Sequence, residues 1–239
     1  MDADLTRAET RVSIALFALT VTSGAVDAIT FLGLGHAFAA LATGNLLLVG
    51  FGVARAPGIP IGRPAAALGA FVIGAALCHV VIARLVGGGH RWFVTVLSAE
   101  TAVLAAAGLC AVTLGAETHS PPYVLSLVIA ILACAMGWRT RLMIESRVPE
   151  MPTTVVQISL VKALTDVLSF GGHHSAMRAL ARARRIATVL GIFVGGVAGA
   201  GLLRLGIGPA ILVVTAFEAC VVAVYARSPG LRPLPPRQT

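Results

Sequence analysis

The chain alternates between long apolar segments and short breaks that are polar or rich in proline and glycine. Eight apolar segments can be delimited, each close to the roughly 17–25 residues that a membrane-spanning helix needs. Prolines and glycines fall in the breaks, where a helix is expected to end. The pattern therefore predicts eight helices, at residues 12–34, 37–54, 64–86, 92–115, 122–144, 153–170, 186–205 and 208–226.

The composition places these helices in a membrane. Hydrophobic residues make up 57% of the 239 residues and charged residues 12%, whereas soluble domains have about 25% charged residues. A water-soluble fold could not cover its surface with so few charges, so we expect an all-α integral membrane protein. The net charge of +8 does not indicate nucleic-acid binding, because the arginines alternate with apolar segments instead of forming one basic face.

Both ends of the chain are predicted to lie in the cytoplasm. Residues 1–11 are acidic at three positions and precede an apolar segment too long for a signal peptide, so this segment is interpreted as the first spanning helix. Residues 227–239 are proline-rich and are expected to be disordered. With eight spans, eleven arginines fall on the side of the termini and six on or near the other side. This bias favours cytoplasmic termini.

The first four segments resemble the last four in their order, which indicates an internal repeat. Polar residues interrupt the second and sixth segments, in "TGNLLLVG" and "QISLVKAL", and a glutamate occupies the middle of the fourth and of the eighth. We therefore expect two four-helix repeats, at residues 12–115 and 122–226. Four crossings return the chain to its starting side, so the repeats would share one orientation about an axis along the membrane normal.

A motif in the first repeat carries a resemblance to a known family. The stretch "GAVDAITFLGLGHAFAALATGN" resembles the YoaK-like family of bacterial multi-pass membrane proteins through Gly24, Asp27, Ala28, Phe38, Ala40, Thr43, Gly44 and Asn45. The second half keeps part of the corresponding pattern, in Met136, Gly137, Thr153 and Thr154. It departs from the pattern at 139–140, with Arg-Thr for Gln-Asn, and at 157–158, with Gln-Ile for Thr-Gly. The resemblance implies a multi-helix fold in the inner membrane of a bacterium.

Polar residues at similar depth in the two halves predict a substrate site between them. The candidates are Asp27, Thr43, Asn45, Arg139, Thr140, Gln157 and Ser159. A charge inside a bilayer is costly, so Asp27 is expected to pair with Arg139 or Arg141. The alternative is that Asp27 only forms a local cap or a hydrogen bond with Thr43.

Four more ionisable residues fall inside predicted spans and are candidates for proton or ion coupling: Glu100, Glu218, Lys162 and Asp166. Burial disfavours a charged carboxyl group, so Glu100 and Glu218 could be neutral and exchange protons, or could form structural hydrogen bonds. Lys162 and Asp166 are four residues apart and face one side of a helix, where they could pair or contact a solute.

Catalysis is not predicted. The sequence has no nucleotide-binding, zinc-protease or serine-hydrolase motif, and its four cysteines form no C-x-x-C pair, so we expect neither a metal nor another cofactor. The expected function is transport of a small solute, with proton coupling as an option. The alternative is a non-transporting scaffold or assembly protein. The expected partners are the lipid bilayer and an unknown small solute; a homo-oligomer is compatible with the sequence, and nucleic acid is not expected.

Overall fold

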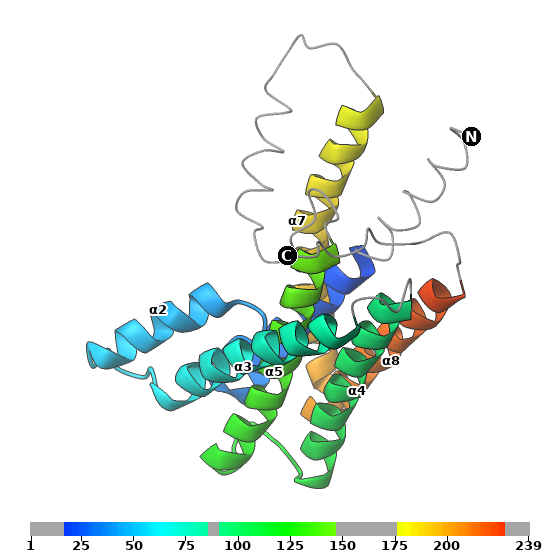
Figure 1. Ribbon diagram of the computed structural model, residues 1–239. Coiled ribbons are helices and arrows are strands. Elements are labelled where there is room, and N and C mark those ends of the chain that lie inside the picture. The colour runs from blue at the N-terminus through cyan, green and yellow to red at the C-terminus, as the bar shows by residue number, and fades with distance from the viewer. Residues whose placement is uncertain (1–16, 86–90, 147–175, 228–239) are drawn as a thin grey trace.

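The computed structural model describes residues 17–85, 91–146 and 176–227, and every regular element in these ranges is a helix (Figure 1). The first helix covers Phe17–Gly35, and its last part is the π-helix η1 (Thr30–Gly35). It is followed by α2 (Ala42–Val53), α3 (Gly62–Leu85), α4 (Arg91–Thr113), α5 (Pro122–Ser146), α7 (Ala176–Leu202), the 3-10 turn η2 (Leu203–Leu205) and α8 (Ile207–Ala226). The all-α fold expected from the sequence is confirmed for these ranges.

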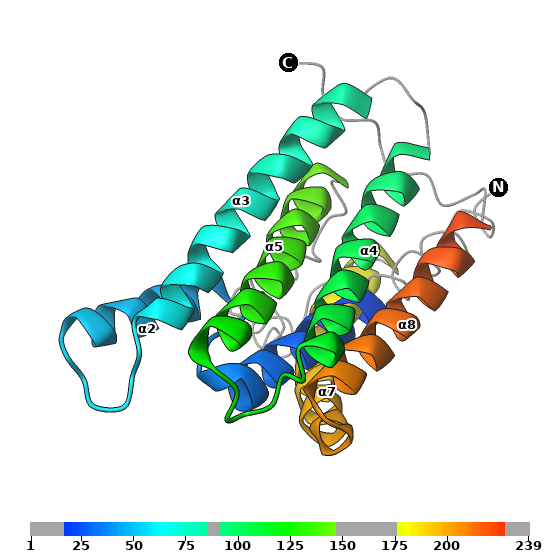
Figure 2. The ribbon, with the colours of Figure 1, turned by 90° about the horizontal axis from the view of Figure 1, so that it is seen from below.

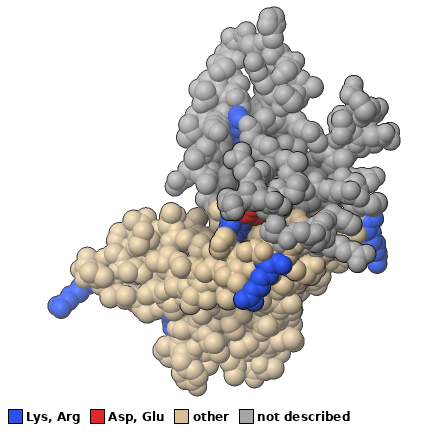
Figure 3. Space-filling model, in the orientation of Figure 1, with Lys and Arg blue, Asp and Glu red and all other residues tan. Residues whose placement is uncertain are grey.

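Six of the described helices are long and apolar enough to span a bilayer. They are the first helix, α3, α4, α5, α8 and the segment Arg185–Leu205, which covers most of α7 and η2. On the face shown in Figure 3, the described surface is almost entirely uncharged, with a few arginines, which suits contact with lipid. The predicted span at residues 153–170 lies outside the described residues.

Helix α2 is too short to cross the membrane. Its 12 residues extend about 18 Å at a rise of 1.5 Å per residue, against a hydrocarbon layer of about 30 Å. The predicted full span at residues 37–54 is therefore wrong.

Hydrogen bonds explain why α2 begins only at Ala42. His36 has a left-handed backbone conformation (φ 58°, ψ 41°) where the π-helix ends. The Asn45 side chain accepts the Phe38 N–H at 2.9 Å and donates to the Phe38 carbonyl at 2.6 Å. These bonds satisfy backbone groups that a continuous helix would otherwise use, so residues 37–41 form a loop.

The first helix and α7 cross with their backbones in contact. A Cβ atom on Gly24 would collide with the carbonyl oxygen of Ile192. Along α7, Gly191 contacts Thr20, Gly195 contacts Val21 and Gly199 contacts Ala25. Later residues of α7 thus contact later residues of the first helix. The helices therefore run in the same direction. Small residues permit such close approach in a bilayer, where dispersion and hydrogen bonds hold helices together.

Helices α3 and α5 cross at glycines in the same way. A Cβ atom on Gly74 would collide with the carbonyl oxygen of Cys134, and one on Gly137 would collide with that of Phe71. Figure 2 shows α3 and α5 side by side, with the chain rising along both, and Figure 1 shows where the two helices cross.

Helices α4 and α8 pack on each other in opposite directions (Figure 2). The Thr101 hydroxyl in α4 lies 3.0 Å from a carboxyl oxygen of Glu218, near the middle of α8. A Cβ atom on Gly208, at the start of α8, would touch Val112 near the end of α4. Repeats with the same orientation in the membrane would have placed α4 and α8 in the same direction. The expected axis along the membrane normal is therefore wrong.

The helix ends fall on two sides of the bundle, and we call the side where the first helix ends the far side. There Gly33 contacts Ile207 at the start of α8, and Gly35 contacts Arg63 at the start of α3. The α4–α5 connection lies on the same side, because α4 ends where α8 begins. The opposite, near side holds the start of the first helix, the ends of α3, α5 and α8, and the starts of α4 and α7. The segment between the first helix and α3 thus begins and ends on the far side.

Single cysteines should report this arrangement once the four native cysteines are replaced by alanine. Arg84→Cys and Arg227→Cys should react with a membrane-impermeant maleimide from one side of sealed vesicles, and Pro57→Cys from the other, because α2 does not cross. Labelling of positions 57 and 227 from the same side would instead support eight spans.

The glycine crossings should be sensitive to a single methyl group. Gly74→Ala places a Cβ atom against the α5 backbone and should lower the free energy of unfolding by about 1–3 kcal/mol. The matched control in the same helix is Gly69→Ala, whose Cβ atom would meet nothing within 4 Å. It should be neutral or stabilising by up to about 1 kcal/mol. Denaturant unfolding in mixed micelles measures both, and equal midpoints would contradict the crossing.

Candidate functional site

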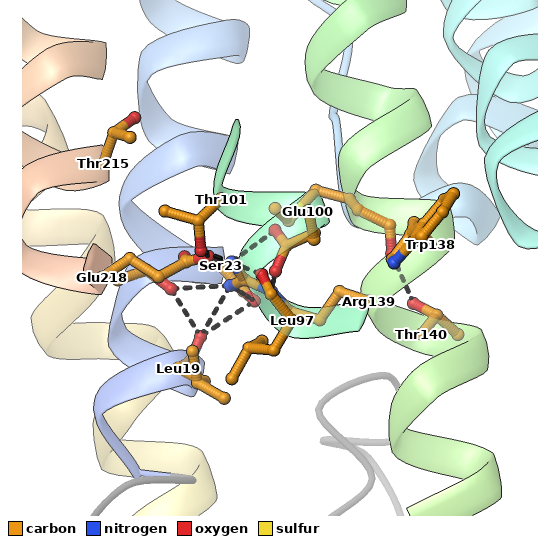
Figure 4. A network of polar contacts seen from close by, with 12 residues as sticks. Leu19, Ser23, Leu97, Glu100, Thr101, Trp138, Arg139, Thr140, Thr215 and Glu218 are labelled. Carbon is orange, nitrogen blue, oxygen red and sulfur yellow. Dashed lines mark hydrogen bonds and ion pairs between the residues drawn. The ribbon is translucent and has the colours of Figure 1, made fainter. Parts of the chain in front are cut away.

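Three buried ionisable side chains meet where α5 faces the crossing of α4 and α8 (Figure 4). Arg139 of α5 is 1% exposed, and Glu100 of α4 and Glu218 of α8 are both 0% exposed. Arg139 Nη2 donates to Glu100 Oε1 at 2.7 Å and also to Glu218 Oε2, and Nε donates to Glu100 Oε2 at 3.2 Å. The structure thus joins in one network residues that the sequence had assigned to two separate roles, substrate binding and coupling.

The first helix supplies the remaining acceptors for the guanidinium. Arg139 Nη1 lies 2.6 Å from the Thr22 hydroxyl oxygen, 3.1 Å from that of Ser23 and 3.1 Å from the Leu19 carbonyl oxygen. Thr22 and Ser23 direct their own hydroxyl hydrogens back to Leu19, at 2.9 and 3.1 Å. Their oxygens are therefore free to accept from Arg139.

The network lies well inside the apolar part of the molecule. Glu100 is the tenth of the 23 residues of α4, and Glu218 the twelfth of the 20 residues of α8. Insertion scales give a cost of about 2.5–3.5 kcal/mol for a charged residue at the centre of a spanning helix. A buried charge is tolerated when it is paired and hydrogen-bonded, and Arg139 meets both conditions.

Asp27 does not join this network, and the expected ion pair with Arg139 or Arg141 is not formed. Asp27 is half-buried, and its Oδ1 accepts the Ala40 N–H at 2.7 Å. The Arg139 donors are used by the network described above, and Arg141 pairs instead with Glu145 at 2.7 Å. The local alternative was therefore closer to the structure, but the partner of Asp27 is a backbone amide and not Thr43.

Asp27 and Asn45 together fix the loop between the first helix and α2. Asp27 binds the loop at Ala40, just before the start of α2, where a negative charge is favoured by the helix dipole. Asn45 binds the same loop at Phe38 from inside α2. Asp27 and Asn45 of the motif thus hold a non-helical turn, of the kind a bilayer tolerates only where protein covers it.

The other candidates are not brought to the network. Thr43 is exposed on α2, and Thr140 donates its hydroxyl hydrogen to the Met136 carbonyl of its own helix at 2.9 Å. Four further candidates, Gln157, Ser159, Lys162 and Asp166, lie outside the described residues. Within the ranges that are described, no three His, Cys, Asp or Glu side chains converge to hold a metal ion.

Sequence reasoning missed the hydroxyl groups that complete the site. Thr22 and Ser23 accept from Arg139, and Thr101 contacts Glu218. The available signal was the run "TVTS" at residues 20–23, which places several hydroxyls in an otherwise apolar helix. Such a run is informative only when a buried donor is known to face it.

Removing the arginine should be far more costly than removing its neighbour on the same helix. Arg139→Gln leaves buried carboxyl groups without their cation and should lower the free energy of unfolding by about 3–5 kcal/mol. Arg141→Gln breaks a partly exposed pair within one helix, where a loss of about 0–1 kcal/mol is typical. Denaturant unfolding of both variants in mixed micelles makes the comparison, and losses of equal size would argue against a central role for Arg139.

Comparison with known proteins agrees with the motif. The profile of the family described as "Protein of unknown function (DUF1275)" matches residues 15–224. The chain is similar to the "UPF0700 transmembrane protein YoaK" of Bacillus subtilis (strain 168), with 28% identity over 153 residues. This alignment covers 62% of the present chain and 64% of the relative, and no solved structure matches the chain. Since the profile spans nearly all of the described helices, the chain belongs to the DUF1275 family and is a multi-pass membrane protein similar to YoaK.

Proposed function

We propose that this protein transports a small solute across the bacterial inner membrane, coupled to protons, with the network of Arg139, Glu100 and Glu218 at its centre. The observation that carries the proposal is that one buried guanidinium serves two buried carboxyl groups. A single positive charge balances only one carboxylate. The second must therefore hold a proton or leave a net negative charge in a medium of low dielectric constant, so the network is suited to proton exchange.

The close helix contacts support two halves of opposite orientation. Gly24 contacts Ile192, which lies three positions before Gly195. Gly195 in turn contacts Val21, which lies three positions before Gly24. The same pattern is found between α5 and α3. Gly137 contacts Phe71, three positions before Gly74, and Gly74 contacts Cys134, three positions before Gly137. The pair formed by the first helix and α7 therefore corresponds to the pair formed by α5 and α3. With α4 and α8 antiparallel, this correspondence favours an axis in the membrane plane, an arrangement used for alternating access.

Under this correspondence, the arginine is matched by an apolar residue in the other half. Gly137 lies 113 positions after Gly24, so Arg139 corresponds to Val26, because 26 plus 113 is 139. Glu100 and Glu218 occupy similar positions in α4 and α8, the two helices that face each other across the proposed axis. One arginine thus serves two related carboxyl groups and has no counterpart of its own. The far-side loop held by Asp27 and Asn45 would border one end of the solute pathway.

The distribution of arginines supports a cytoplasmic near side. Among the described helix ends and loops, seven arginines lie on the near side: Arg84, Arg91, Arg178, Arg182, Arg184, Arg185 and Arg227. Three lie on the far side: Arg55, Arg63 and Arg204. The eight-span prediction had Arg55 and Arg63 on the side of the termini, and Arg84 and Arg91 on the opposite side. Because α2 does not cross the membrane, the two pairs exchange sides. The bias of seven to three favours a cytoplasmic near side by the positive-inside rule.

A scaffold without transport is the second candidate, and one observation favours it. All three nitrogens of the Arg139 guanidinium have acceptors within the protein. A network that is satisfied in this way can simply lock the first helix, α4, α5 and α8 together. Transport requires that at least one of these contacts open during the cycle.

Proton movement in proteoliposomes separates the two candidates. The full-length chain is reconstituted with a trapped pH-sensitive dye, and alanine, lactate or glucose is added outside. For a transporter, at least one probe should change the internal pH, and Glu218→Gln should abolish the change. Thr215→Val is the matched control on α8, because the Thr215 hydroxyl donates only to Ile211 of its own helix at 2.9 Å. Folded wild-type protein that moves no protons with any of these probes would favour the scaffold.

A further inference from the structure

A second polar cluster lies on the outer surface of the bundle, toward the near side. It consists of His79 of α3 together with Arg141 and Glu145 of α5. His79 is exposed, and the side chains of Arg141 and Glu145 are 25% and 15% exposed. Large apolar side chains on the same two helices are exposed as well: Val72, Val80 and Ile144. The cluster is thus set in a surface that suits lipid.

Its position is unusual for ionisable residues in spanning helices. Such residues almost always face the interior of a bundle or a water-filled cavity. Arg139, two positions before Arg141 on α5, follows this rule. His79 and Arg141 instead reach the outer surface, where hydrocarbon would be a poor environment for them. A polar ligand that comes from the lipid phase would satisfy them.

The depth of the cluster fits a lipid headgroup. His79 lies six positions before the end of α3, and Arg141 five positions before the end of α5. At a rise of 1.5 Å per residue, both are about 8–9 Å from the near ends of their helices. The Arg141 guanidinium meets Glu145, one turn closer to the near side, so the long side chain carries its charge toward the headgroups.

The cluster has hydrogen-bond donors to spare. Arg141 Nη2 lies 2.7 Å from Glu145 Oε2 and 3.0 Å from His79 Nδ1. A guanidinium has five N–H groups, and among the contacts of the described residues the three on Nε and Nη1 meet no acceptor. Since arginine can only donate, His79 accepts on Nδ1 and carries its own hydrogen on Nε2. Phosphate is the anion that such a set of donors recognises best.

The cluster also has an acceptor to spare. Glu145 uses Oε2 for Arg141, and within the described ranges no donor reaches Oε1. The charges of Arg141 and Glu145 cancel, and a histidine that accepts on Nδ1 is neutral. A headgroup with one phosphate and one ammonium is neutral too, and it matches both the donors and the acceptor. A headgroup with a phosphate alone would face the Glu145 carboxylate without a compensating charge.

We propose that His79, Arg141 and Glu145 bind the headgroup of a phospholipid that carries a primary ammonium group, in the near-side leaflet. The phosphate accepts from Arg141 and His79, and the ammonium donates to Glu145. Helices α3 and α5 cross at Gly74 and Gly137, about one turn before the cluster (Figure 1). The lipid therefore bridges the two helices beyond their crossing. This binding does not depend on the proposed transport function.

Native mass spectrometry of the full-length chain tests the ligand. The protein is released from micelles that contain equal amounts of phosphatidylethanolamine, phosphatidylcholine and phosphatidylglycerol. It should retain phosphatidylethanolamine preferentially, because the choline headgroup has no N–H to donate and the glycerol headgroup has no ammonium. Equal retention of the ethanolamine and choline lipids, preference for phosphatidylglycerol, or displacement of the lipid by inorganic phosphate would overturn the proposal.

Variants of the cluster test the site. Arg141→Gln should weaken retention of phosphatidylethanolamine by about tenfold or more, because hydrogen bonds to charged groups are the stronger ones. Glu145→Gln should keep a bound phospholipid but lose the preference for ethanolamine over choline. The matched control is Arg84→Gln, which removes an exposed arginine near the same end of α3, outside the cluster. It should leave retention unchanged. Equal retention by the wild-type protein and Arg141→Gln would mean that the cluster only clips two helices together, and would overturn the proposal.

Discussion

Arg139 presents five N–H donors at a position where its side chain is 1% exposed. Each donor that lacked an acceptor there would cost about 1–3 kcal/mol, and more for a charged group. The acceptors come from three other helices: carboxyl groups from α4 and α8, and hydroxyl and carbonyl oxygens from the first helix. The depth and rotation of all four helices are therefore tied to one side chain.

The hydroxyls of Thr22 and Ser23 are on short side chains, so the first helix must lie close to Arg139 of α5. The first helix is held against α7 at Gly24 and Gly195, and α5 against α3 at Gly74 and Gly137. These contacts lie within a few residues of the polar network, since Ser23 precedes Gly24 and Arg139 follows Gly137 by two positions. Backbone contact and buried polarity are thus adjacent in both halves. A shift at either crossing would therefore move a helix that supplies a donor or an acceptor to the network.

The sequence predicted the membrane class and most of the helices, because apolar length is a local property. It predicted α2 wrongly, because the loop before α2 depends on bonds from Asp27 to Ala40 and from Asn45 to Phe38, and counts of apolar residues do not register such bonds. One missed turn then changed the orientation expected for α4 and α8. For the site, the sequence named Arg139 as a candidate for substrate binding and Glu100 and Glu218 as candidates for coupling, and the structure shows that all three side chains are buried. It could not place them together, since no periodic pattern links α5 to α4 and α8.

A single arginine has a consequence that a pair would not have. Under the proposed relation of the two halves, Val26 occupies the position that corresponds to Arg139. A second arginine there would set two guanidinium groups against two carboxylates, and all four charges would be balanced in one protonation state. With one arginine, two carboxyl groups compete for one cation, and the network is neutral only when a proton occupies the other acid. The departure from symmetry at this position thus creates a group that can gain and lose a proton without leaving a buried cation unpaired.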